Sequence, residues 1–126
     1  MAQLKDSLNL LSHMTWARAW NLFRLGVSFQ IQKFSKSGKN NAMPFSLSIE
    51  PTTACNLGCP ECPSGLKQFS RATGKLDLNL HQRMLEEVSK TSFYINYYFQ
   101  GEPFLHPQFL NLIQQAKKKK IYTATS

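Results

Sequence analysis

The spacing of apolar residues changes along the chain, and that change predicts its elements. From residue 4 to about residue 34, large apolar side chains recur three and four positions apart, which is typical of an amphipathic helix. One side of it carries Trp16, Trp20, Phe23, Val27, Ile31 and Phe34, and the opposite side carries Leu22, Leu25 and Phe29. The pattern therefore predicts one long N-terminal helix that is apolar on more than one face.

Residues 35–41 (SKSGKNN) have the composition of a linker, so we expect a helix and linker over 1–41 and a separate core domain over 42–126. The ordinary interpretation of the helix is packing against a domain or another subunit. Contact with a membrane surface is the alternative, favoured by Arg18, Arg24 and Lys33 along the helix.

Beyond the linker the pattern predicts strand, helix, strand, helix, strand. The strands are expected at 45–50, 93–99 and 121–126. Apolar and polar residues alternate in the first, whereas the second is nearly all aromatic or β-branched, which is typical of a strand covered on both sides. Asp77 or Asn79 can cap the first helix, and Pro107 can open the second. The apolar faces of these helices are His81, Met84, Leu85 and Val88 in the first and Phe109, Leu112, Ile113 and Ala116 in the second.

Two consecutive β-α-β units give a parallel sheet with right-handed crossovers, so the fold class is α/β. Ligands of such folds bind at the carboxyl ends of the strands. The segments that follow the three strands should therefore meet at one edge. In the first strand, Phe45, Leu47 and Ile49 should pack under the helices, and Glu50 should lie at the rim.

The net charge of +8 does not change this picture, because the excess lies mostly in the run 117–120 and in scattered N-terminal lysines. Lysines at a helix end usually form a solvated terminus, and no nucleic-acid-binding motif accompanies them, so no nucleic-acid partner is expected. The N-terminus lacks the pattern of a secretory signal, so we expect a cytoplasmic, reducing compartment.

The chemistry of the chain is concentrated in the segment 50–65 (EPTTACNLGCPECPSG), which holds all three cysteines, Cys55, Cys59 and Cys62. Thiolates are good ligands for zinc and for iron–sulfur clusters. A structural zinc site would need a fourth ligand, and the candidates His13, His81 and His106 are all distant in sequence. Three cysteines on a [4Fe–4S] cluster would leave one iron open to a non-protein ligand.

The spacing Cys55-x3-Cys59-x2-Cys62, with Gly101-Glu102-Pro103 after the next strand, resembles the radical S-adenosylmethionine (radical SAM) superfamily. The texts SIEPTTACNLGCPECPSG and FQGEPFLHP are similar to the branch whose members often carry a SPASM domain. The resemblance covers residues 43–126. It departs from the family pattern at Glu61, where an aromatic residue is common, and at Gln100, where a glycine is common.

The resemblance implies the N-terminal part of a partial (β/α)6 TIM-like barrel, in a fragment of a longer enzyme that is inactive by itself. It implies a [4Fe–4S] cluster on the three cysteines and S-adenosylmethionine (SAM) chelating the open iron. Reductive cleavage of SAM would then give a 5′-deoxyadenosyl radical that abstracts hydrogen from a substrate. The SAM-binding residues it implies are Gln100, Gly101, Glu102, Pro103 and Ser126.

The family also implies an electron donor such as flavodoxin or ferredoxin, and the branch suggests a peptide substrate. The alternative to the enzyme is a non-catalytic module that binds zinc or an iron–sulfur cluster.

Overall fold

A computed structural model, which describes residues 2–35, 40 and 42–125, contains one parallel sheet with the strand order β1-β2-β3. The strands are β1 (Ser46–Ile49), β2 (Tyr94–Tyr97) and β3 (Tyr122–Thr125). Residue Ile49 is paired with Tyr97, and Tyr97 with Thr125, so the three strands end level with one another. The α/β class and the alternation of three strands with two helices are as expected from the sequence.

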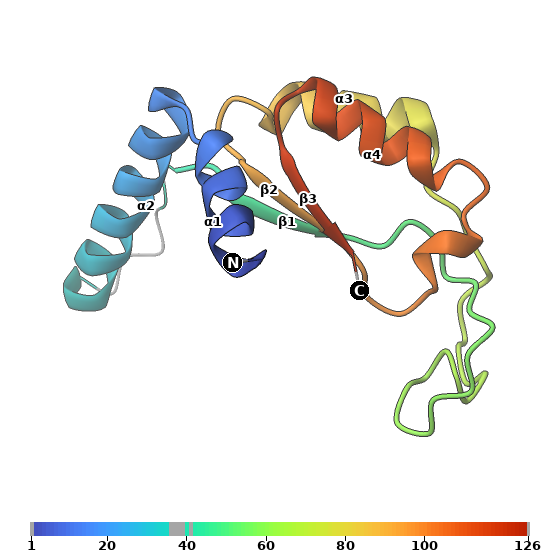
Figure 1. The fold of residues 1–126 in the computed structure, drawn as a ribbon. Helices are drawn as coiled ribbons and strands as arrows, with labels where there is room; N and C mark the ends of the chain where they lie inside the picture. The colour runs from blue at the N-terminus through green and yellow to red at the C-terminus, as the bar shows by residue number, and fades with distance from the viewer. Residues whose placement is uncertain (1, 36–39, 41, 126) are drawn as a thin grey trace.

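Helices α3 (Leu78–Val88) and α4 (Phe109–Lys118) both lie over the same face of the sheet (Figure 1). Asp77 caps α3, because its carboxylate accepts hydrogen bonds from the backbone N–H groups of Asn79 and Leu80 at 2.9 and 3.0 Å. The core between these helices and the sheet consists of Leu85, Ile95, Tyr97, Phe109, Leu112, Ala116 and Ile121, with Leu47 and Ile49 packed against it. The predicted inward face of the first strand is therefore confirmed for Leu47 and Ile49, whereas Phe45 is not part of this core and stacks on Phe93.

The other face of the sheet is less covered than the aromatic composition of residues 93–99 suggested. On β2, Ile95 and Tyr97 are fully buried, whereas Tyr94 and Asn96 are half-buried. Successive side chains of a strand point to opposite faces, and within the described residues α3 and α4 cover only one of them. Helix α1 (Ala2–Ser12) contacts the second face through Tyr122, which donates a hydrogen bond to Asp6 and stacks on Tyr94, so the expectation that this strand is covered on both sides is met only in part.

The prediction of a single N-terminal helix is wrong, because the structure has two helices, α1 (Ala2–Ser12) and α2 (Trp16–Ser35). The Ser12 hydroxyl donates to the carbonyl of Asn9, and the Thr15 hydroxyl accepts from the N–H of Arg18 at 3.3 Å. These bonds end one helix and begin another. The apolar spacing alone did not reveal the break.

Likewise, Pro107 does not open α4. The N–H of Gln108 donates to Nδ1 of His106 at 3.1 Å, which holds Pro107 and Gln108 in a turn, and the helix begins at Phe109. A 3-10 turn, η1 (Pro103–Leu105), precedes it.

The two N-terminal helices are attached to the sheet domain through polar side chains. Arg18 is 2% exposed, and its guanidinium donates to backbone carbonyls at the ends of three helices. These acceptors are the carbonyls of His13, Ser89, Lys119 and Lys120, at 2.5 to 3.2 Å. Asn21 exchanges two hydrogen bonds with the backbone of Met43, just before β1.

Candidate functional site at the carboxyl ends of the strands

The carboxyl ends of the three strands lie at one edge of the sheet, and the long connection after β1 extends from that edge (Figure 1). This connection runs from Glu50 to Asp77 and contains the three cysteines. The turn at Gln100–Pro103 follows β2, and Thr125 ends β3. The parallel topology therefore brings together the segments expected from the sequence.

The base of the cysteine loop is closed by a short antiparallel clip between residues 51–53 and 74–76. Thr52 is bridged to Lys75, and the Leu76 N–H donates to the Pro51 carbonyl at 2.8 Å. The buried Thr52 hydroxyl donates to the Gly74 carbonyl at 3.0 Å and accepts from the N–H of Ala54. Residues 54–73 therefore form a loop with a fixed base.

Within the loop, close backbone contacts join Cys59, Cys62 and Gly65. The Cys62 N–H donates to the Cys59 carbonyl at 3.3 Å. A Cβ atom added to Gly65 would lie 2.4 Å from that carbonyl oxygen, so no larger residue fits there without moving Cys59. Backbone hydrogen bonds from Gly65 and then from Ser64 lower the pKa of the Cys62 thiol, which favours the thiolate that binds metals.

The loop does not bring the three thiols together into a formed metal site. Among the described residues, no three His, Cys, Asp or Glu side chains are placed to hold one metal ion. The donor set fits an iron–sulfur cluster all the same, because three thiols lie in one loop and are unpaired, with Cys55 and Cys62 half-buried and Cys59 exposed. The assignment of the cysteines as cluster ligands stays a prediction.

The turn after β2 is joined directly to the cysteine loop. The hydroxyl of the buried Ser64 donates to the carbonyl of Gln100, and the Glu102 N–H donates to the carbonyl of Ala54 at 2.8 Å. A Cβ atom added to Gly101 would lie 1.7 Å from the Thr52 carbonyl oxygen, so only glycine allows this approach. The predicted glycine is thus required where the two motifs meet.

The remaining predicted residues of this turn have structural contacts. The Glu102 carboxylate accepts from the Phe104 N–H at 3.2 Å and caps η1, whose first residue is the buried Pro103. The last predicted residue, Ser126, lies outside the described residues. Its neighbour Thr125 donates through its hydroxyl to the Tyr97 carbonyl at 2.9 Å.

Arg71 connects the ends of β1 and β2. It forms an ion pair with Glu50 at 2.8 Å, donates to the side chain of Gln100 at 3.4 Å, and lies over the ring of Phe69. Glu50 therefore lies at the rim beside the cysteine loop, as expected. A hollow of about 340 Å³ opens next to it and is lined by Thr53, Ala54, Cys55, Ser64, Lys67, Phe69, Arg71 and Thr73.

The three histidines considered as zinc ligands are engaged elsewhere. His81 is fully buried between Tyr97 and Gln115, at 2.8 and 2.6 Å. His106 uses one ring nitrogen to contact the Leu76 carbonyl and the other to accept from Gln108. Nδ1 of His13 contacts the Asn9 carbonyl at 2.7 Å. These contacts do not support a zinc site completed by a histidine.

Sequence reasoning missed three residues of this region, namely Ser64, Arg71 and Asn96. Asn96 has a buried side-chain oxygen, Oδ1, which has no hydrogen-bond partner among the described residues, and it lies on the face of β2 opposite α3 and α4. A polar residue within an aromatic strand was a usable signal for Asn96. Ser64 and Arg71 had none, because their partners are 36, 21 and 29 positions away.

Comparison with known proteins gives two curated relatives, and no protein-family model matches the chain. The chain is 33% identical over 76 residues to the tungsten-containing aldehyde ferredoxin oxidoreductase cofactor-modifying protein of Pyrococcus furiosus, which covers 58% of this chain. It is 29% identical over 80 residues to the PqqA peptide cyclase of Gluconobacter oxydans, which covers 64% of it. The matches span only 20% and 22% of these relatives.

Among solved structures, the crystal structure of BtrN in complex with AdoMet and 2-DOIA is similar, with a TM-score of 0.54 and 20% identity. The match covers 66% of this chain and 35% of that one, and at this identity it shows a common fold. The cysteine spacing and the turn after β2 resemble those of the radical SAM superfamily, and the similarities to these relatives and to this fold agree with that resemblance.

Proposed function

We propose that this chain supplies the cluster-binding part of a radical SAM enzyme, with Cys55, Cys59 and Cys62 as ligands of a [4Fe–4S] cluster. The observation that carries the proposal is the direct connection between the cysteine loop and the turn after β2. The two motifs touch through Ser64 and Gln100 and through Ala54 and Glu102, at the edge where parallel α/β folds bind ligands.

The residues around the cluster have separable roles in this proposal. The backbone N–H groups of Gly65 and Ser64 hold Cys62 toward its thiolate form, and Gly65 keeps the loop close to Cys59. At the turn, Gly101 lets the backbone lie close to the Thr52 carbonyl, and oxygen acceptors there suit the amino group of SAM. When bound, the cluster and SAM supply one-electron cleavage of a carbon–sulfur bond, which yields a 5′-deoxyadenosyl radical.

The partial (β/α)6 barrel, the SPASM-containing branch, the electron donor and the substrate belong to the same proposal. A peptide is the substrate class we propose, supported by the similarity to a protein named for cyclising a peptide. A flavodoxin or ferredoxin would supply the electron. Asn96, whose Oδ1 has no partner among the described residues, faces the side of the sheet that would line the barrel.

Anaerobic reconstitution with iron and sulfide tests the proposal. We expect a brown protein with about four irons per chain, and a change in the electron paramagnetic resonance spectrum of the reduced cluster when SAM is added. Replacing any one cysteine by alanine should abolish stable cluster assembly, whereas Ser70→Ala in the same loop should not. Full iron and sulfide in a single-cysteine variant, or a colourless protein with stoichiometric zinc, would refute it.

A further inference from the structure

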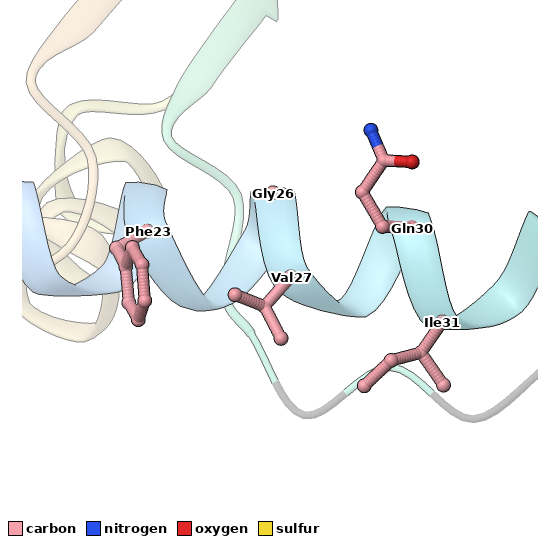
Figure 2. Close-up of a pocket in the computed structure, with 5 residues that line it drawn as sticks. All are labelled: Phe23, Gly26, Val27, Gln30 and Ile31. Carbon is pink, nitrogen blue, oxygen red and sulfur yellow. The ribbon is translucent and has the colours of Figure 1, made fainter.

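The side of α2 that faces away from the sheet domain is strongly apolar. Its outer stripe consists of Trp16, Trp20, Phe23, Val27, Ile31 and Phe34, which are 41% to 85% exposed. Figure 2 shows Phe23, Val27 and Ile31 projecting from one side of the helix, with Gln30 directed to the other side. A shallow hollow of about 420 Å³ lies along these residues.

The opposite side of α2 contacts the domain through the polar residues Arg18 and Asn21. Helix α1 repeats this arrangement, because Asp6 accepts a hydrogen bond from Tyr122 while three of its four leucines are exposed. Those leucines are Leu4, Leu8 and Leu11, which are 57% to 67% exposed. A surface helix normally buries its apolar stripe and exposes its polar one. Both N-terminal helices instead expose apolar side chains, and in α2 Phe29 on the opposite side is exposed as well.

The charge of this region indicates what covers the stripe. Between Ser7 and Ile49 the sequence has five Lys and Arg residues and no Asp or Glu. They are Arg24, Lys33, Lys36 and Lys39, together with Arg18, which is buried against the domain and does not face the surroundings. A second copy of the chain would bring this positive segment against itself, whereas an anionic surface would complement it.

We propose that α1 and α2 lie in the interface of an anionic lipid bilayer, with the outer stripe at the boundary between headgroups and acyl chains. Aromatic and aliphatic residues on one side of a basic helix are the features of helices that lie on membranes, and tryptophan favours this depth. No helix in the described part of the chain is long and apolar enough to cross a membrane, so the contact is peripheral. In Figure 1, α2 projects to the side of the sheet.

Vesicle binding followed by tryptophan fluorescence tests the proposal directly, because Trp16 and Trp20 are the two tryptophans of the chain and both lie in the stripe. With vesicles of phosphatidylcholine and phosphatidylglycerol, we expect a blue shift of the emission, quenching by brominated lipid, and flotation of the whole chain. Pure phosphatidylcholine vesicles should bind at least about tenfold more weakly, and added salt should weaken binding to the anionic vesicles.

Two matched double variants distinguish binding through the outer stripe from nonspecific binding through any exposed apolar residue. Phe23→Gln with Ile31→Gln should reduce affinity for the anionic vesicles about tenfold or more. Leu80→Gln with Leu110→Gln, which removes two exposed leucines from α3 and α4, should leave it unchanged. Circular dichroism melts of both variants check that they are folded.

Three results would overturn the proposal. They are equal binding of the two double variants, equal binding to neutral and anionic vesicles, and absence of binding. A concentration-dependent dimer seen by light scattering, abolished by Phe23→Gln with Ile31→Gln in a chain that ignores vesicles, would assign the stripe to a second copy instead.

Discussion

At the scale of single residues, the site depends on one position where only glycine fits and on one hydroxyl that joins two loops. These are Gly101, which faces the carbonyl of Thr52, and Ser64, which reaches the carbonyl of Gln100. Each has a counterpart in the chain that can serve as a matched control.

Gly101→Ala should displace the turn after β2, because its Cβ atom would lie 1.7 Å from a backbone oxygen that cannot rotate away. We expect a loss of about 1–3 kcal/mol in the free energy of unfolding and weaker binding of SAM to the reconstituted protein. Chemical denaturation and calorimetric titration measure the two effects. Gly74→Ala is the control, because its added Cβ would meet nothing within 4 Å. Equal behaviour of the two variants would contradict the close approach.

Ser64→Ala should weaken the connection between the cysteine loop and the turn, since it leaves the Gln100 carbonyl without the hydroxyl that donates to it. The expected cost is about 1–2 kcal/mol in unfolding free energy, together with a lower iron content after reconstitution. Ser70→Ala, at an exposed position of the same loop, should change neither quantity. An unaltered iron content in Ser64→Ala would show that the connection does not organise the loop.

At the scale of elements, the unexpected feature is how the N-terminal helices are held. Arg18 brings one cation to the carbonyl ends of α1, α3 and α4, where the helix dipoles are negative. Burial lowers the pKa of Arg18, yet a guanidinium remains protonated at any ordinary pH. Arg18, together with Asn21, therefore fixes the position of α2 against the domain.

Arg18→Gln should be strongly destabilising, because a shorter neutral side chain leaves several buried carbonyls without a donor. We expect a loss of about 3 kcal/mol or more in unfolding free energy. Hydrogen exchange should also become faster in α1 and α2. Lys33→Gln removes a charge from an exposed position of the same helix and should change the stability by less than about 0.5 kcal/mol. Similar losses in both variants would argue against the anchoring role.

At the scale of the whole molecule, the core contains a buried histidine whose protonation opposes folding. Burial lowers the pKa of His81, and the smaller effect of its hydrogen bond to Gln115 raises it. The neutral ring donates to Gln115 and accepts from the Tyr97 hydroxyl. The unfolded chain binds this proton at the ordinary histidine pKa of 6.5, so stability is complete above that pH and falls as the pH decreases below it.

Denaturation midpoints measured between pH 8 and pH 5 should therefore decrease with falling pH. His81→Gln should be less stable at every pH but should lose less stability across this window. In His13→Gln, which alters a histidine of the N-terminal helices, the decline should persist. An unchanged pH profile in His81→Gln would show that another group causes the decline.

Much of the architecture is encoded locally and could be predicted. The spacing of apolar residues predicted three strands and two connecting helices. Asp77, one of two candidate caps, indicated where α3 begins, and the β-α-β pattern predicted a parallel sheet. The cysteine spacing and the Gly-Glu-Pro turn predicted the site because both follow strand ends that a parallel sheet must bring together. These features depend on residues close to one another in sequence.

Only the tertiary structure decided which groups connect these parts. The break between α1 and α2, the contact of Ser64 with Gln100, and the pairing of Arg71 with Glu50 leave no mark in the apolar pattern. Arg18 binds backbone carbonyls up to 102 positions away. Because every residue has a backbone carbonyl, the sequence does not indicate which ones Arg18 will bind. The orientation of α2 followed from these backbone acceptors, and it turned the most apolar side of that helix away from the domain.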